Sequence, residues 1–88
     1  MRTIKMFLRG NCPRCPQAKL VSEELRSEGY PVVYFDLSTV DGLAEGAFHS
    51  VMATPTILLV DKDDRELAEW RGVVPSRDDV KREFCLTV

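Results

Sequence analysis

The sequence has no long hydrophobic run and no block of like charge, and these two absences exclude several classes of protein. Its longest aliphatic stretch, at 57–60, is far too short to span a bilayer. The segment 1–8 alternates charged and apolar residues without a small-residue cleavage pattern, so we do not expect a signal peptide. The net charge of −2 is dispersed, which favours neither nucleic acid nor a membrane as a partner.

The sequence has few cysteines, and their number is odd. Three cysteines among 88 residues do not form the even set that is typical of a secreted disulfide framework. We therefore expect a cytoplasmic protein, where a cysteine pair is more often catalytic or metal-binding than a structural crosslink. Hydrophobic residues at 44% and charged residues at 30% indicate a globular chain, and its length predicts a single domain, 1–88.

Hydrophobic periodicity predicts secondary-structure elements in the order β-α-β-α-β-β-α. Strands separated by helices favour parallel pairing, whereas a polar turn between the last two strands favours an antiparallel hairpin. The order therefore predicts an α/β fold in which three helices flank a four-stranded mixed sheet. The expected strands are 3–8, 32–35, 56–60 and 66–71, and the expected helices are 13–28, 38–49 and one after Ser76.

The two later helices carry different start signals. Ser38 and Asp41 resemble a capping box, but Gly42 and Gly46 should each weaken the second helix by about 1 kcal/mol relative to alanine. Ser76 is expected to cap the last helix, which turns its apolar side chains inward.

A Cys-Pro-Arg-Cys motif, from Cys12 to Cys15, lies where the first strand ends and the first helix begins. The thiolate is the nucleophile of thiol chemistry, and a free cysteine is mostly protonated at neutral pH. A helix start presents backbone N–H groups and partial positive charge, to which Arg14 and Arg9 add full charges. We therefore expect a lowered pKa for the Cys12 thiol, while Cys15, farther into the helix, should titrate higher.

The spacing of the motif lets its two sulfurs close a small ring. Cys12 can then attack a target disulfide, and Cys15 can attack the resulting mixed disulfide and release the reduced target. Pro13 fits the first helical turn. Pro16 at the fourth helical position removes a backbone donor, so the start of this helix should be distorted.

Zinc is the alternative reading of a cysteine pair. A structural zinc site needs four ligands, and the chain offers only Cys85 and His49 beyond the pair, far apart in sequence. Redox chemistry is therefore favoured. We expect Cys85 to be an inert, partly buried residue and His49 to be solvated at the end of its helix.

Three features together resemble the thioredoxin/glutaredoxin superfamily: the cysteine motif at the first helix, the Val-Met-Ala-Thr-Pro-Thr segment 51–56, and Gly72 after the fourth strand. The resemblance covers essentially the whole chain and implies the thioredoxin fold. It also implies that Pro55 follows a cis peptide bond and lies against the cysteines. It further implies that the backbone of Thr54 pairs with an extended substrate segment and that Gly72 forms part of the groove wall.

Several positions depart from the patterns of the superfamily. Full-size thioredoxins have a tryptophan where Asn11 stands and a buried aspartate where Met6 stands. Glutaredoxins usually have an aromatic residue where Arg14 stands and a Gly-Gly-x-Asp segment where 72–75 differs. The chain thus resembles a glutaredoxin-sized redoxin with thioredoxin-like activity.

These patterns predict a thiol-disulfide oxidoreductase that reduces protein disulfides. Cys12 is the expected nucleophile and Cys15 the resolving thiol, and Pro13 and Arg14 join Thr54, Pro55 and Gly72 in contacting substrate. The expected partners are disulfide-containing client proteins and a separate reductase or glutathione as electron donor; we expect a monomer without cofactor or metal. Two alternatives stay open: a glutathione-dependent glutaredoxin and a non-catalytic metal-holding module.

Overall fold

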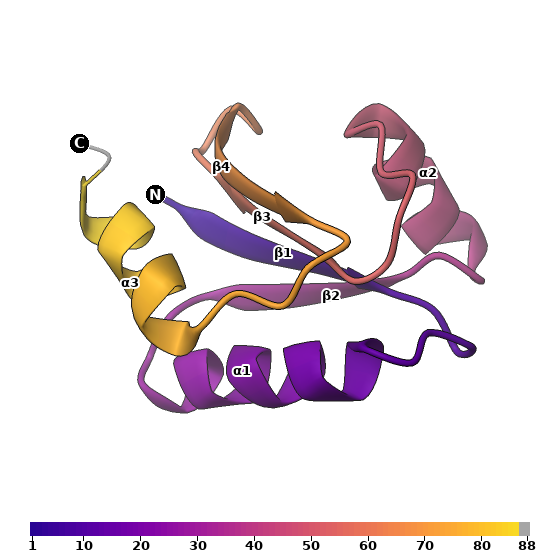
Figure 1. Ribbon diagram of the computed structural model, residues 1–88. Coiled ribbons are helices and arrows are strands. Elements are labelled where there is room, and N and C mark those ends of the chain that lie inside the picture. Colours follow the sequence, from indigo (N-terminus) through magenta and orange to yellow (C-terminus); the bar gives the residue numbers. More distant parts are fainter. Residues whose placement is uncertain (87–88) are drawn as a thin grey trace.

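Four strands form one mixed sheet in the order β2-β1-β3-β4, with helices on both faces (Figure 1). The computed structural model describes residues 1–86. The predicted order of elements and the predicted fold are confirmed. The elements are β1 (Thr3–Leu8), α1 (Cys15–Ser27), β2 (Val32–Asp36), α2 (Val40–Phe48), β3 (Thr56–Val60), β4 (Glu66–Arg71) and α3 (Arg77–Leu86).

The register of the sheet brings several loops to one end. β1 is parallel to β2 and antiparallel to β3, and Phe7 pairs with both Phe35 and Thr56. The expectation of parallel pairing therefore holds for β1 and β2 but not for β3, because residues 49–55 return the chain to the end where β2 finishes. Thr56 also pairs with Arg71 at the end of β4. The loop after β1, the turn before β3 and the turn after β4 therefore lie at the same end of the sheet.

The two faces of the sheet carry separate cores. α1 and α3 cover one face and α2 lies on the other (Figure 1). Alternation along the strands sends successive side chains to opposite faces, so both cores draw on the same strands. The first core contains Ile4, Met6, Ala18, Leu25, Val32, Ile57, Leu59 and Val80, and the second contains Phe7, Leu37, Leu58 and Val60.

α2 lies close to the sheet because two of its residues have no side chain. A Cβ at Gly42 would overlap the backbone carbonyl of Asp36, and a Cβ at Gly46 would meet Leu37. The expected cost of these glycines to the helix is thus offset by the close approach they permit. The expected cap at Ser38 was wrong: Oγ1 of Thr39 accepts the bond from the N–H of Gly42 at 3.0 Å.

α3 begins as expected but exposes its cysteine. The N–H of Asp79 donates to Oγ of Ser76 at 3.1 Å, which confirms the cap. Phe84 faces inward and meets the ring of Tyr30 edge-on at 4.9 Å. Cys85 is exposed rather than partly buried, because it lies one residue farther round the helix than Phe84. No helix within residues 1–86 is long and apolar enough to cross a membrane.

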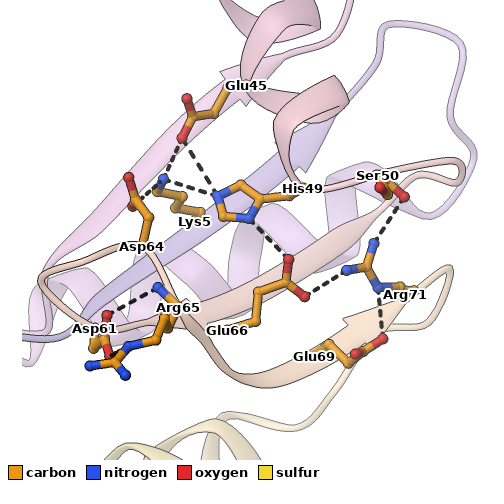
Figure 2. A network of polar contacts seen from close by, with 10 residues as sticks. All are labelled: Lys5, Glu45, His49, Ser50, Asp61, Asp64, Arg65, Glu66, Glu69 and Arg71. Atoms are coloured by element: carbon orange, nitrogen blue, oxygen red, sulfur yellow. Dashed lines mark hydrogen bonds and ion pairs between the residues drawn. The ribbon is translucent and has the colours of Figure 1, made fainter.

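A network of charged side chains closes the α2 face beside the second core (Figure 2). Nζ of Lys5 donates to Glu45, to Asp64 at 2.8 Å and to Nε2 of His49 at 3.2 Å. Nδ1 of His49 lies 3.0 Å from Glu66. The prediction of a solvated His49 was wrong, since only 3% of the residue is exposed. α2 lies so close to the sheet that its C-cap residue, His49, points at β1 and β4 rather than at solvent.

The network continues to the edge strand. Arg71 donates to Glu66 and Glu69 from β4 itself, at 2.8 and 2.7 Å, and to the carbonyl of Ser50 at 3.2 Å. Burial lowers the pKa of Arg71, but the hydrogen bonds and charges of the two glutamates outweigh it and raise the pKa overall. The segment that follows α2 is thereby tied to β4.

Candidate active site

Cys12 and Cys15 form a disulfide at the end of the sheet where the loops meet. Their Cα atoms are 5.3 Å apart, and the residues are 9% and 6% exposed. Two successive turns hold the loop: the N–H of Cys12 donates to the carbonyl of Arg9, and the N–H of Cys15 donates to the carbonyl of Cys12, each at 3.3 Å. The pairing that the motif predicted is therefore present, and the disulfide holds the Cys12 sulfur against the first residue of α1.

The first helix starts later than its sequence suggested. α1 begins at Cys15 with Arg14 as its N-cap residue, so Pro13 lies in the exposed turn before it. Pro16 is therefore the second helical residue and not the fourth. The N–H groups of a first turn have no intrahelical acceptor, so a proline there costs no hydrogen bond. The expectation of a distorted helix start was wrong for this reason.

The turn before β3 and the turn after β4 face the motif. The peptide bond between Thr54 and Pro55 is cis. The N–H of Gly72 donates to the carbonyl of Pro55 at 2.8 Å, and Nη1 of Arg14 donates to the carbonyl of Gly72 at 3.3 Å. Gly72 has a φ of +72°, which favours glycine. A short chain of hydrogen bonds thus joins the motif to the Pro55 turn, and the structure brings all the residues proposed for the site together.

The rim on this side of the site is apolar and open. Met52 is 92% exposed and Val73 is 47% exposed, and Ala53 between Met52 and the cis bond is exposed as well. Thr54 lies outside the ladders of β3, whose pairs begin at Thr56. Its backbone is therefore not used in the sheet.

A basic hollow also borders the disulfide, away from the apolar rim. Arg9, Pro16 and Lys19 line it together with Cys12 and Cys15, and none of its wall residues is acidic. Its volume is about 240 Å³, below the ~300–1,000 Å³ of typical cofactor pockets, so it accommodates a few side chains. The sequence reasoning missed Lys19. The signal was present, because a helix brings residues four apart to one face and Lys19 follows Cys15 by four.

The cysteine pair has no metal-binding neighbours within residues 1–86. The His/Cys/Asp/Glu cluster in that range whose atoms could converge on an ion is formed by Glu45, His49 and Asp64. Nζ of Lys5 already lies among these three residues and contacts each of them. The cation of that cluster is therefore the lysine ammonium, and the cysteines stand apart from it.

Met6 is fully buried, at the place where the resemblance marked the absence of a carboxylate. The charges near the disulfide thus come from Arg9, Arg14 and Lys19. Two cysteines in disulfide contact at a helix start, at the same end of this mixed sheet as a cis proline, define a thiol-disulfide oxidoreductase.

Comparison with known proteins places that chemistry in a family. A probable thioredoxin from Archaeoglobus fulgidus is 32% identical over 63 residues, which cover 70% of this chain and 69% of that protein. The chain belongs to the thioredoxin family. No family model matches it.

Solved structures support the fold at lower sequence identity. Thioredoxin-2 of a malaria parasite superposes with a TM-score of 0.81 at 22% identity, over 97% of this chain and 82% of that one. A thioredoxin from Thermus thermophilus superposes with a TM-score of 0.71 at 21% identity, over 97% of this chain and 74% of that one. The backbone arrangement is thus shared even where few residues are.

Proposed function

We propose that this oxidoreductase reduces disulfide bonds of client proteins through its cysteine pair. In the reduced protein the Cys12 thiolate attacks one sulfur of the client disulfide, which forms a mixed disulfide and releases the first client thiolate. The Cys15 thiolate then attacks the Cys12 sulfur, which restores the Cys12–Cys15 disulfide and releases the second client thiolate. Two electrons pass from the protein to the client, and the protons of the two cysteines pass to the client thiols. The observation that carries this proposal is the pairing of Cys12 with Cys15 at a Cα separation of 5.3 Å.

The assignment of roles follows from position. Cys12 precedes α1 in a turn whose other residues, Asn11, Pro13 and Arg14, are exposed, whereas Cys15 is the first residue of the helix. The partial positive charge of the helix start and the guanidinium groups of Arg14 and Arg9 favour a thiolate at Cys12. Cys12 is thus the group that reaches a client, and Cys15 is the group that reaches Cys12.

Thr54, Pro55 and Gly72 form the client-binding wall in this proposal. The backbone of Thr54 is outside the sheet ladders and can pair with an extended client segment by strand addition. Arg14 lies across the same groove through its bond to the Gly72 carbonyl, and Pro13 is exposed beside it. The exposed Met52 and Val73 give the wall an apolar rim that suits protein surfaces.

The proposal also extends to the protein's setting. A separate reductase or glutathione returns electrons to the Cys12–Cys15 disulfide, and the chain works as a monomeric single domain. The exposed, unpaired Cys85 suits a reducing compartment such as the cytoplasm, where thiols stay reduced.

Two assays run side by side test this function. The reduced protein should reduce the interchain disulfides of insulin with dithiothreitol or a flavin-dependent reductase as donor, and a Cys12→Ser variant should not. Reduction of a glutathione mixed disulfide on a peptide is measured in parallel with glutathione as donor. Activity in the second assay alone would replace the proposed function by a glutathione-dependent one.

A further inference from the structure

The basic hollow beside the disulfide continues along α1. Its walls Pro16 and Lys19 are shared with a second hollow that reaches Leu20 and Tyr34. We call the two adjoining hollows, from Cys12 to Tyr34, the α1 groove. It leads from the disulfide towards Tyr34 on β2, whereas Gly72 follows β4 at the other edge of the sheet.

The near end of the α1 groove carries unneutralised positive charge. Arg9 and Lys19 are exposed, and neither forms an ion pair with a carboxylate in the described part of the chain. Glu23 is the acidic residue of the farther hollow. Its carboxylate accepts a hydrogen bond from the hydroxyl of Tyr34 and lies 3.9 Å from Nη1 of Arg26. Because the whole chain has a net charge of −2, this local excess of positive charge departs from the average surface.

The far end of the groove has an apolar centre flanked by Glu23 and Arg26, which pair with each other at 3.9 Å. Leu20 is 67% exposed, although it stands on a helix whose buried face already covers the sheet. The ring of Tyr34 is held beside it, with Nζ of Lys19 at 6.0 Å and the guanidinium of Arg26 at 5.9 Å from the ring centroid. Burial and the nearby Glu23 raise the pKa of Tyr34, so its hydroxyl stays neutral. The groove thus changes from net positive beside Cys12 to a neutral, apolar centre at Leu20 and Tyr34.

We propose that the α1 groove docks an acidic segment of the client protein adjoining the client's reactive cysteine. A carboxylate of that segment meets Arg9 and Lys19, and an apolar side chain farther along lies against Leu20 and the ring of Tyr34. The complementary charges raise the rate of encounter and hold the client disulfide over Cys12. This inference rests on the proposed function, because docking only presents the disulfide and leaves the exchange itself unchanged.

A set of disulfide peptides tests the charge preference. Each peptide contains one intramolecular disulfide flanked by two glutamates, two glutamines or two lysines, followed by leucine or serine. The measured quantity is the second-order rate constant for oxidation of the reduced protein. At low ionic strength the glutamate peptide should react at least about tenfold faster than the lysine peptide. The ratio should fall towards one at ~1 M salt, where the Debye length is only ~3 Å.

Matched variants locate the effect. In Arg9→Glu/Lys19→Glu the ratio of glutamate to lysine rates should invert. Arg2→Glu/Lys62→Glu changes the net charge equally at the opposite end of the sheet and should retain the preference. Using the ratio cancels any change in the reactivity of Cys12. Leu20→Ser should slow the leucine peptide several-fold and leave the serine peptide unchanged.

Each contrary result has a distinct meaning. Equal rates for the glutamate and lysine peptides, or a preference that survives Arg9→Glu/Lys19→Glu, would overturn the docking proposal while the protein still reduced disulfides. The variants are also tested on a peptide that carries glutathione as a mixed disulfide. If Arg9→Glu/Lys19→Glu slows reduction of that peptide alone, the docking proposal is overturned, because the groove would then bind the carboxylates of glutathione. If even the glutamine peptide is not reduced, the proposed function fails and the docking proposal fails with it.

Discussion

Lys5 and His49 share a hydrogen bond between their side-chain nitrogens, 3.2 Å apart, in a site almost closed to solvent. Lysine can only donate, so Nε2 of His49 accepts and its proton resides on Nδ1, which donates to Glu66 at 3.0 Å. The other two protons of the ammonium are directed to Glu45 and Asp64. Burial lowers the pKa of Lys5, but its bonds to Asp64 and Glu45 outweigh burial and raise the pKa overall.

Removing the ammonium should therefore destabilise the protein. Lys5→Met leaves His49 without its donor and places Glu45 near Asp64 without a cation. Because both carboxylates are partly exposed and can take up water, we expect a loss of about 1–3 kcal/mol in the free energy of unfolding. Urea denaturation measures it. Lys62→Met, at an exposed lysine in the hairpin turn, should change stability by less than about 0.5 kcal/mol; equal losses in both variants would contradict the role of Lys5.

The two glycines of α2 should resist substitution by alanine, although alanine is the better helix former. Gly42→Ala would force its methyl group into the carbonyl of Asp36, so the helix must move away from the sheet. We expect a loss of about 2 kcal/mol or more. Gly10→Ala has no atom within 4 Å of the new methyl group and should be nearly neutral. A stabilised Gly42→Ala protein would mean that α2 does not lie as close as described.

The resolving role of Cys15 predicts a trapped intermediate. Cys15→Ser should accumulate mixed disulfides between Cys12 and client proteins, whereas Cys12→Ser should trap none. Because Cys85 is exposed, both variants are made in a Cys85→Ser background. Nonreducing gels and mass spectrometry identify the linked residue. A folded Cys15→Ser protein that traps no client would reject this role.

The hairpin between β3 and β4 should contribute to stability in a pH-dependent way. Hydrogen bonds from the N–H groups of Arg65 and Asp63, with the Arg65 charge, hold the pKa of Asp61 below its ordinary value of 3.8. A group with a depressed folded pKa stabilises the protein above its unfolded pKa and loses this contribution as pH falls through the folded value. The protein should therefore have a larger free energy of unfolding than Asp61→Asn at pH 6, and this difference should disappear well below pH 3.8. A difference in the free energy of unfolding that is the same at pH 2 as at pH 6 would contradict this role of Asp61.

The order of elements and the cysteine site could be predicted from sequence because their signals are local. The continuous apolar run in 56–60, the Ser76 cap and the spacing of Cys12 and Cys15 depend on neighbours within a few residues. The cis peptide bond before Pro55 could be predicted only from the family resemblance, because most bonds that precede proline are trans.

What the sequence did not indicate depends on contacts between distant segments. The burial of His49 follows from Lys5 and Glu66, which are 44 and 17 residues away. The antiparallel direction of β3 follows from the path of residues 49–55, and no pattern within those residues predicts it. Both errors concern where chain segments meet, and local periodicity does not contain that information.

The redox equilibrium of the Cys12–Cys15 pair tests the central claim most directly. The protein is equilibrated with dithiothreitol or glutathione buffers of known potential, and the fraction of free thiols is measured by alkylation and mass. We predict a two-electron transition at about −200 to −280 mV, the span of reducing thiol-disulfide proteins. A potential near about −120 mV, as in a strong oxidant, or two cysteines that never pair reversibly, would contradict the account.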